Sequence, residues 1–180
     1  AVTSIFRPGP LSAGVDADYV EAKEHPHQIA YLSDEACEIT QETFGFLIFQ
    51  EQIALLAHKL GGLTLDEGNM LRKVLTKKGT GKGSVKHKLH TKFIKGCVAK
   101  GIARDQAQGL WDKFEFFSGY GFNKSHAVSY SIISFQCAWL LNYYPAEWMA
   151  AFLDKEPETR KEKAINIAKK YGFKIAPLHI

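Results

Sequence analysis

The chain has 180 residues, 46% of them apolar and 12% aromatic, which supports a folded core and excludes wholesale disorder. Its three cysteines are widely spaced without a CxxC motif, which argues against a disulfide framework or a zinc ribbon. No stretch reaches the roughly 18 apolar residues that a membrane span needs, and residues 1–7 lack the pattern of a signal peptide. We therefore expect a cytoplasmic protein with no membrane partner.

The charge of the chain is unevenly distributed, although the formal net charge is only +4. Residues 68–104 hold eleven Lys or Arg and no Asp or Glu, whereas the rest of the chain holds twelve Lys or Arg and nineteen acids. A solvated helix face usually includes interspersed acids. Their complete absence from this basic block (residues 68–104) favours a polyanionic partner such as nucleic acid.

The hydrophobic spacing predicts a mainly α, multi-helix fold with at most short strands. Helices are expected over residues 15–24, 33–43, 53–60, 67–76, 85–100, 105–117, 125–143, 146–153 and 160–171. Short strands are expected over 29–32 and 173–175, and residues 44–49 are expected to be either a strand or the start of a buried helix. Thr64 and Glu67 have the spacing of a capping box. Arg7-Pro8-Gly9-Pro10 is predicted to be non-helical, because proline lacks a backbone N–H and disfavours a helical conformation for the residue before it.

The stretch from Gly119 to Tyr130 is the clearest candidate binding motif. A glycine-broken aromatic turn precedes a helix that should begin near Lys124, Ser125 and His126. Free backbone N–H groups at such a helix start favour an anion, and His126 and Tyr130 share a helix face. The pattern is typical of a cradle for a phosphorylated, base-bearing ligand, but a capped core helix explains it equally well.

Other chemistry is less well supported by the sequence. The loop Gly79-Thr80-Gly81-Lys82-Gly83-Ser84 lacks the first glycine of a P-loop, since that position is Thr76, and a basic helix precedes it where a P-loop needs an apolar strand. We expect a mobile basic hairpin near a phosphate backbone instead. His25-Pro26-His27 is expected to be a bare turn. No Asp-x-Asp pair lies in an apolar strand, so we assign neither catalytic nor metal-binding residues.

Several blocks, in order, resemble the fingers domain of the bacterial DNA polymerase III α subunit, the family C replicative polymerase. The blocks are Phe6-Arg7-Pro8-Gly9-Pro10-Leu11, Thr43-Phe44-Gly45-Phe46-Leu47-Ile48-Phe49-Gln50-Glu51-Gln52-Ile53, residues 70–78, residues 117–130, residues 144–151 and Lys174-Ile175-Ala176-Pro177. They extend over nearly the whole chain.

Lys73 stands where a second Arg is usual, Thr76 stands where Gly is usual, and the glycine loop replaces an acidic helical stretch. These departures suggest a divergent relative, for example from a phage.

The resemblance implies three parts: residues 1–35 as a loop-rich segment leading from the palm, residues 36–153 as the helical fingers core, and residues 154–180 as a C-terminal helix and exit segment. It implies the fingers of a DNA-directed DNA polymerase, a nucleotidyltransferase that positions dNTP and template–primer DNA for 5′–3′ synthesis. Catalysis in this family uses Mg²⁺ and palm carboxylates that this chain lacks, so the chain alone should be inactive. The palm, thumb and C-terminal region, and a sliding clamp bound through other regions, are further implied partners.

The resemblance also implies residue roles. Nucleotide-binding residues would be Arg72, Lys73, Lys124, Ser125, His126 and Tyr130, with Arg72 on the phosphates, His126 on phosphate or sugar, and Tyr130 beside the base. DNA-binding residues would be Lys77, Lys78, Lys82, Lys86, Lys88 and Lys92. The alternative is a stand-alone nucleic-acid-binding helical module that uses the basic block. A polymerase needs Arg72, His126 and Tyr130 to converge on one pocket, whereas a plain binder does not.

Overall fold

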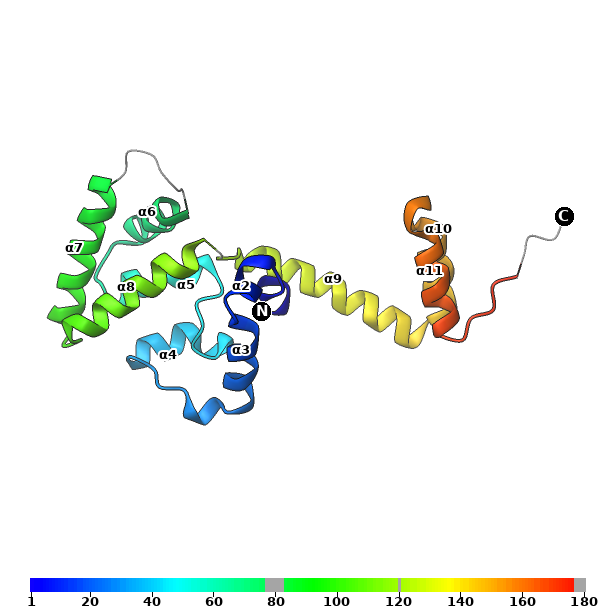
Figure 1. Ribbon diagram of the computed structural model, residues 1–180, viewed down its shortest axis with the longest axis horizontal. Coiled ribbons are helices and arrows are strands. Elements are labelled where there is room, and N and C mark those ends of the chain that lie inside the picture. Colours follow the sequence, from blue (N-terminus) through cyan, green and yellow to red (C-terminus); the bar gives the residue numbers. More distant parts are fainter. Residues whose placement is uncertain (77–82, 120, 177–180) are drawn as a thin grey trace. The chain divides into compact units, whose positions relative to one another are not determined.

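The computed structural model describes residues 1–76, 83–119 and 121–176 (Figure 1). These residues form helices and connecting segments, and no β-sheet occurs among them, so the expected mainly α fold is confirmed. The α-helices are α1 (Val2–Ile5), α2 (Pro8–Ser12), α3 (Val15–Glu24), α4 (Asp34–Thr40), α5 (Gln50–Lys59), α6 (Leu65–Thr76), α7 (Gly83–Ala99), α8 (Arg104–Ser118), α9 (Lys124–Tyr143), α10 (Pro145–Lys155) and α11 (Glu158–Lys170). Short 3-10 helices cover Pro26–Gln28 and Gln41–Thr43. No helix in the described ranges is long and apolar enough to cross a membrane.

The chain forms two compact units, residues 1–127 and residues 128–180. In the first unit, α5, α6, α7 and α8 pack on one another around a hydrophobic core (Figure 1). The largest buried side chains of this core include Ile53, Leu56, Leu71, Phe93, Trp111 and Phe114. The ring centroids of Phe93 and Phe114 are 5.3 Å apart in an edge-to-face arrangement, so aromatic contacts between α7 and α8 add to the apolar burial.

Helix α6 begins at the predicted capping box. The backbone N–H of Thr64 donates to Glu67 Oε2 at 2.7 Å, and the N–H of Glu67 donates to Thr64 Oγ1 at 3.1 Å. Each side chain therefore satisfies a backbone donor that has no partner within the helix. The prediction is confirmed, and the box fixes the start of the helix that carries Arg72.

The buried side chain of Gln52, only 2% exposed, fixes the segment that leads into α5. Its Oε1 accepts from the backbone N–H groups of Ile48 at 3.0 Å and Phe49 at 2.9 Å. Its Nε2 donates to the carbonyl of Ile39 at 3.2 Å and to Thr43 Oγ1 at 2.7 Å. Every polar atom of the amide is thus satisfied, as a buried glutamine requires.

Two features of the N-terminal part differ from expectation. Residues 29–32 and 44–49 form no strand, and in the second segment two backbone N–H groups bond to Gln52 instead of to a neighbouring strand. Arg7-Pro8-Gly9-Pro10 was predicted to be non-helical, but α2 begins at Pro8. Arg7 is extended at the N-cap, and both prolines lie in the first turn, where their missing N–H groups would have no helical partner.

In the second unit, α10 and α11 pack together around Met149, Ala164 and Ala168. Gly172, with φ +84°, follows α11 as the predicted C-terminal glycine, and residues 173–175 form no strand. Helix α9 beyond Ala127 exposes most of its apolar side chains, among them Ile132, Ile133, Phe135, Trp139 and Tyr143.

Gly96 allows close contact between α7 and the end of α5. A Cβ atom at Gly96 would lie 1.9 Å from the backbone oxygen of Gly61, whereas a Cβ at Gly109 in α8 would meet nothing within 4 Å. Gly96→Ala should therefore lower the free energy of unfolding by about 1–3 kcal/mol, because the backbones must separate. The measurement is chemical denaturation of the 180-residue chain.

Gly109→Ala is the matched control, because it makes the same change inside an exposed helical turn. It should raise the free energy of unfolding by up to about 1 kcal/mol, since alanine loses less backbone entropy than glycine in a helix. Equal effects of the two substitutions would contradict the close contact at Gly96.

Candidate nucleotide-binding site

The start of α9 is joined to the start of α5 by backbone pairing. The N–H of Phe122 donates to the carbonyl of Ile48 at 3.0 Å, and the N–H of Gln50 donates to the carbonyl of Phe122 at 3.0 Å. Phe49 and Phe122 thereby form an isolated parallel bridge. This pairing places the motif after Gly119 beside a segment that precedes it by about seventy residues.

The side chain of Gln50 extends this junction to α6. Its Nε2 donates to the carbonyl of Gly121 at 3.0 Å, and its Oε1 accepts from Arg72 Nη1 at 3.1 Å. A Cβ on Gly121 would come within 2.8 Å of Gln50 Cγ, so the turn lies directly against the glutamine. Arg72 is half-buried at this position. Gln50 therefore links the predicted phosphate-binding arginine to the glycine turn.

Two further cationic or ionisable side chains border the same turn. The guanidinium carbon of Arg7 lies 5.4 Å from the centroid of the Phe122 ring. The centroid of the His126 ring lies 5.3 Å from the same Phe122 centroid. Arg7 and His126 thus lie against the Phe122 ring, and Arg72 is linked to Gly121 through the side chain of Gln50. We expected His126 and Arg72 to be near each other, but Arg7 was absent from the predicted site.

The backbone amides at the start of α9 differ from expectation. The N–H of Lys124 donates to Glu51 Oε2 at 3.1 Å, and the N–H of His126 donates to Asn123 Oδ1 at 3.0 Å. Asn123 therefore acts as the N-cap, and Ser125 Oγ also contacts its side chain. The prediction of free amides for an anion is wrong at Lys124 and His126, because side-chain oxygens from the protein already occupy them.

The ammonium group of Lys124 forms an ion pair with Glu42, and it lies 5.8 Å from the centroid of the Phe49 ring. The positive charge of Lys124 is therefore partly neutralised in this structure. A phosphate that binds here would have to replace the Glu42 carboxylate.

The remaining predicted nucleotide ligands are exposed. Lys73 lies on α6, and Ser125 lies in the first turn of α9. Tyr130 belongs to α9, four residues after His126, and its side chain is 52% exposed. Tyr130 falls in the second compact unit. Its role beside a base stays a prediction.

Acids from outside the basic block neutralise part of it. Lys86 Nζ lies 2.9 Å from Glu115 Oε1, and Lys92 Nζ lies 2.7 Å from Glu67 Oε2. The hydrogen bond from Lys92 and that from the Thr64 backbone lower the pKa of the Glu67 carboxyl, so this partner stays ionised at neutral pH. The Lys88 side chain is exposed. Three predicted DNA ligands, Lys77, Lys78 and Lys82, lie outside the described residues.

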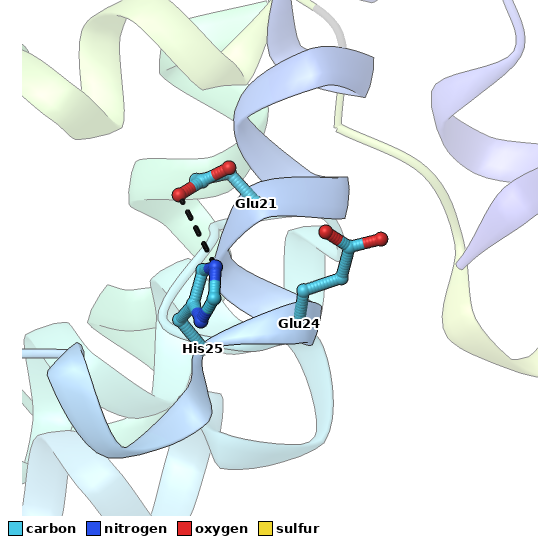
Figure 2. Close-up of side chains that lie close together, drawn as sticks. All are labelled: Glu21, Glu24 and His25. Atoms are coloured by element: carbon cyan, nitrogen blue, oxygen red, sulfur yellow. Dashed lines mark ion pairs between the residues drawn. The ribbon is translucent and has the colours of Figure 1, made fainter.

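A separate cluster of potential metal ligands lies at the end of α3. One ligand atom from each of Glu21, Glu24 and His25 lies within 4.8 Å of the others, and Figure 2 shows the Glu21 carboxylate facing the His25 ring. The Glu21–His25 contact is an i,i+4 pair of 3.7 Å between largely exposed side chains. Such pairs occur on helix surfaces without a metal. None of these three residues belongs to the hydrogen-bonded group of Gln50, Gly121 and Arg72.

The sequence alone gave no role to Gln50, Glu51 or Glu42, which orient the predicted ligands. A signal was present for the first two, since the polar run Gln50-Glu51-Gln52 follows an apolar segment directly at a helix start. Glu42 carries no comparable signal, because its partner Lys124 is 82 residues away along the chain.

Comparison with known proteins shows the family of the chain. The family described as bacterial DNA polymerase III alpha subunit finger domain matches residues 1–101. The chain is 36% identical over 179 residues to the DNA polymerase III subunit alpha of Campylobacter jejuni and 36% identical over 178 residues to that of Aquifex aeolicus. It is 34% identical over 185 residues to that of Escherichia coli K12.

These three alignments each cover 98% of this chain but only 15% to 16% of the relative. The chain therefore spans about a sixth of the length of the proteins it matches. From the finger-domain match and the similarity along nearly its whole length, we conclude that the chain belongs to the bacterial DNA polymerase III alpha subunit family.

Proposed function

We propose that this chain is the fingers portion of a DNA-directed DNA polymerase, where it positions the incoming dNTP and the template–primer DNA. The observation that supports this proposal is that Arg7 and His126 lie against Phe122 while Gln50 links Arg72 to the neighbouring Gly121. A plain nucleic-acid-binding module has no need for such a cluster beside an aromatic turn. The chain alone is inactive in this proposal.

Arg72 holds the triphosphate in this proposal. A guanidinium group offers planar, paired donors that match phosphate oxygens. Arg72 Nη1 donates a hydrogen bond to Gln50 Oε1, and an arginine guanidinium carries five N–H donors in all. His126 donates to a phosphate or to the sugar, Tyr130 packs beside the base, and Lys73 and Ser125 assist.

Lys124 contributes to the site by exchanging the Glu42 carboxylate for a phosphate of the nucleotide. Its ammonium leaves the Glu42 carboxylate and binds phosphate when the nucleotide arrives. The Lys124–Glu42 pair is exposed, with 42% and 46% of the two side chains accessible, so solvent weakens it and breaking it costs little.

The basic block binds the DNA backbone. Lys77, Lys78, Lys82, Lys86, Lys88 and Lys92 are the proposed contacts. Lys88 is exposed and available, whereas Lys86 and Lys92 must first leave Glu115 and Glu67. The resulting neutralisation means that the block contributes fewer phosphate contacts than its sequence charge indicates.

The catalytic Mg²⁺ ions of such a polymerase do not fit this chain. The carboxylates that contact the start of α9, Glu42 and Glu51, both accept hydrogen bonds from Lys124. Two-metal chemistry requires carboxylates that converge on the ions. We therefore assign the metal ligands to parts of the polymerase outside this chain, together with the palm, the thumb and the regions that would bind a sliding clamp.

Arg72→Ala in the full-length polymerase that carries this chain should raise the KM for dNTP about 10- to 100-fold, because a charge-assisted phosphate contact is lost. Arg72→Lys should fall between wild type and Arg72→Ala, since lysine keeps the charge but loses the paired donors. Steady-state primer extension with varied dNTP concentration provides the measurement.

Arg160→Ala is the matched control for Arg72→Ala. Arg160 lies on α11, its side chain is 64% exposed and pairs with Glu156, and it is not among the residues proposed to bind the nucleotide or the DNA. The KM of the Arg160→Ala polymerase for dNTP should stay within about twofold of wild type. An unchanged KM for Arg72→Ala would contradict the proposed nucleotide site.

DNA affinity of the 180-residue chain should fall steeply with salt, by at least about tenfold between 50 and 200 mM, because phosphate contacts release counterions. Lys88→Gln should reduce the slope of log affinity against log salt by about one unit, and Lys23→Gln, outside the basic block, should leave it unchanged. Gel-shift titrations across a salt series measure both. Salt-independent binding would contradict the DNA-binding assignment.

A further inference from the structure

We propose that Gln50 is a positioning residue that orients the guanidinium of Arg72 for the nucleotide phosphates through a neutral amide. This inference rests on the proposed function of Arg72. It adds a residue that contacts no substrate and acts through the arginine.

The hydrogen bonds fix which end of the Gln50 amide faces each neighbour. The carbonyl of Gly121 can only accept, so it must face the Nε2 donor at 3.0 Å. The guanidinium of Arg72 can only donate, so it must face the Oε1 acceptor at 3.1 Å. A rotated amide would place like groups together at both ends, and therefore only one orientation satisfies the site.

The glutamine itself is held at three points. It occupies the first turn of α5, and its backbone N–H donates to the carbonyl of Phe122 at 3.0 Å. Its side chain bonds to the preceding carbonyl, that of Gly121. The α carbon of Gly121 cannot carry a Cβ without a 2.8 Å contact to Gln50 Cγ. The position of the Arg72 guanidinium is thus tied to the turn that precedes His126.

The neutrality of the amide matters for the chemistry. A carboxylate at the same place would orient Arg72 as well, but it would neutralise the charge that attracts the phosphates. Lys124 shows the contrast, because Glu42 pairs with its ammonium. A glutamine orients the cation without adding a negative charge beside it.

The test compares Gln50→Glu and Gln50→Met in the full-length polymerase that carries this chain. Both should raise the KM for dNTP, Gln50→Met by about three- to tenfold and Gln50→Glu by about tenfold or more, with a smaller change in kcat. If Gln50→Met folds poorly, Gln50→Glu alone can carry the test, since a carboxylate in the first turn of a helix is favourable and this variant should fold. Gln28→Glu, the same chemical change at an exposed position, should leave the KM unchanged.

A double-mutant cycle separates positioning from a general loss of stability. If Gln50 acts through Arg72, Gln50→Met should raise the KM by less than about twofold in the Arg72→Ala background. Multiplicative effects of the two substitutions would overturn the inference.

The inference and the proposed function fail in different ways. An unchanged KM for Arg72→Ala contradicts the nucleotide site itself. A raised KM for Arg72→Ala, combined with a wild-type KM for both Gln50 variants, overturns only the positioning role.

Discussion

The pairing of Phe122 with the segment from Ile48 to Gln50 is the constraint on which the candidate site depends. Two backbone hydrogen bonds of 3.0 Å join the starts of α5 and α9. Gln52 makes this pairing specific, because its buried amide occupies the backbone N–H groups of Ile48 and Phe49 and fixes the conformation of the segment. The two glutamines of the run therefore have separate tasks: Gln52 shapes the segment and Gln50 connects it to Arg72.

The net charge of the basic block in the folded chain depends on which carboxylates pack against its lysines, and not only on the residues within the block. The basic block contains no acid in sequence, but Glu67 lies just before the block and Glu115 beyond it, and both form ion pairs with lysines within it. Helix capping contributes to this, because Glu67 closes the capping box with Thr64 and also pairs with Lys92. The polyanion-binding capacity of this unit thus depends on how easily phosphate replaces these carboxylates.

Local signals explain what the sequence could predict. Hydrophobic spacing located the principal helices, and the Thr64–Glu67 spacing identified a helix start that the structure confirms. The α2 helix was missed because proline was treated as a breaker at positions where it fits the first turn. The links from Gln50 to Gly121 and from Lys124 to Glu42 span 71 and 82 residues, and no local pattern encodes such long-range pairs.

The central claim is that Arg72, held by Gln50 beside the Gly121–Phe122 turn, receives the phosphates of an incoming nucleotide. The most direct test is a structure of the full-length polymerase that carries this chain, bound to primed DNA and a non-hydrolysable dNTP. The account predicts that the triphosphate lies within hydrogen-bond distance of the Arg72 guanidinium while Gln50 still contacts it. A triphosphate bound elsewhere, with Arg72 unchanged on Gln50, would contradict the account.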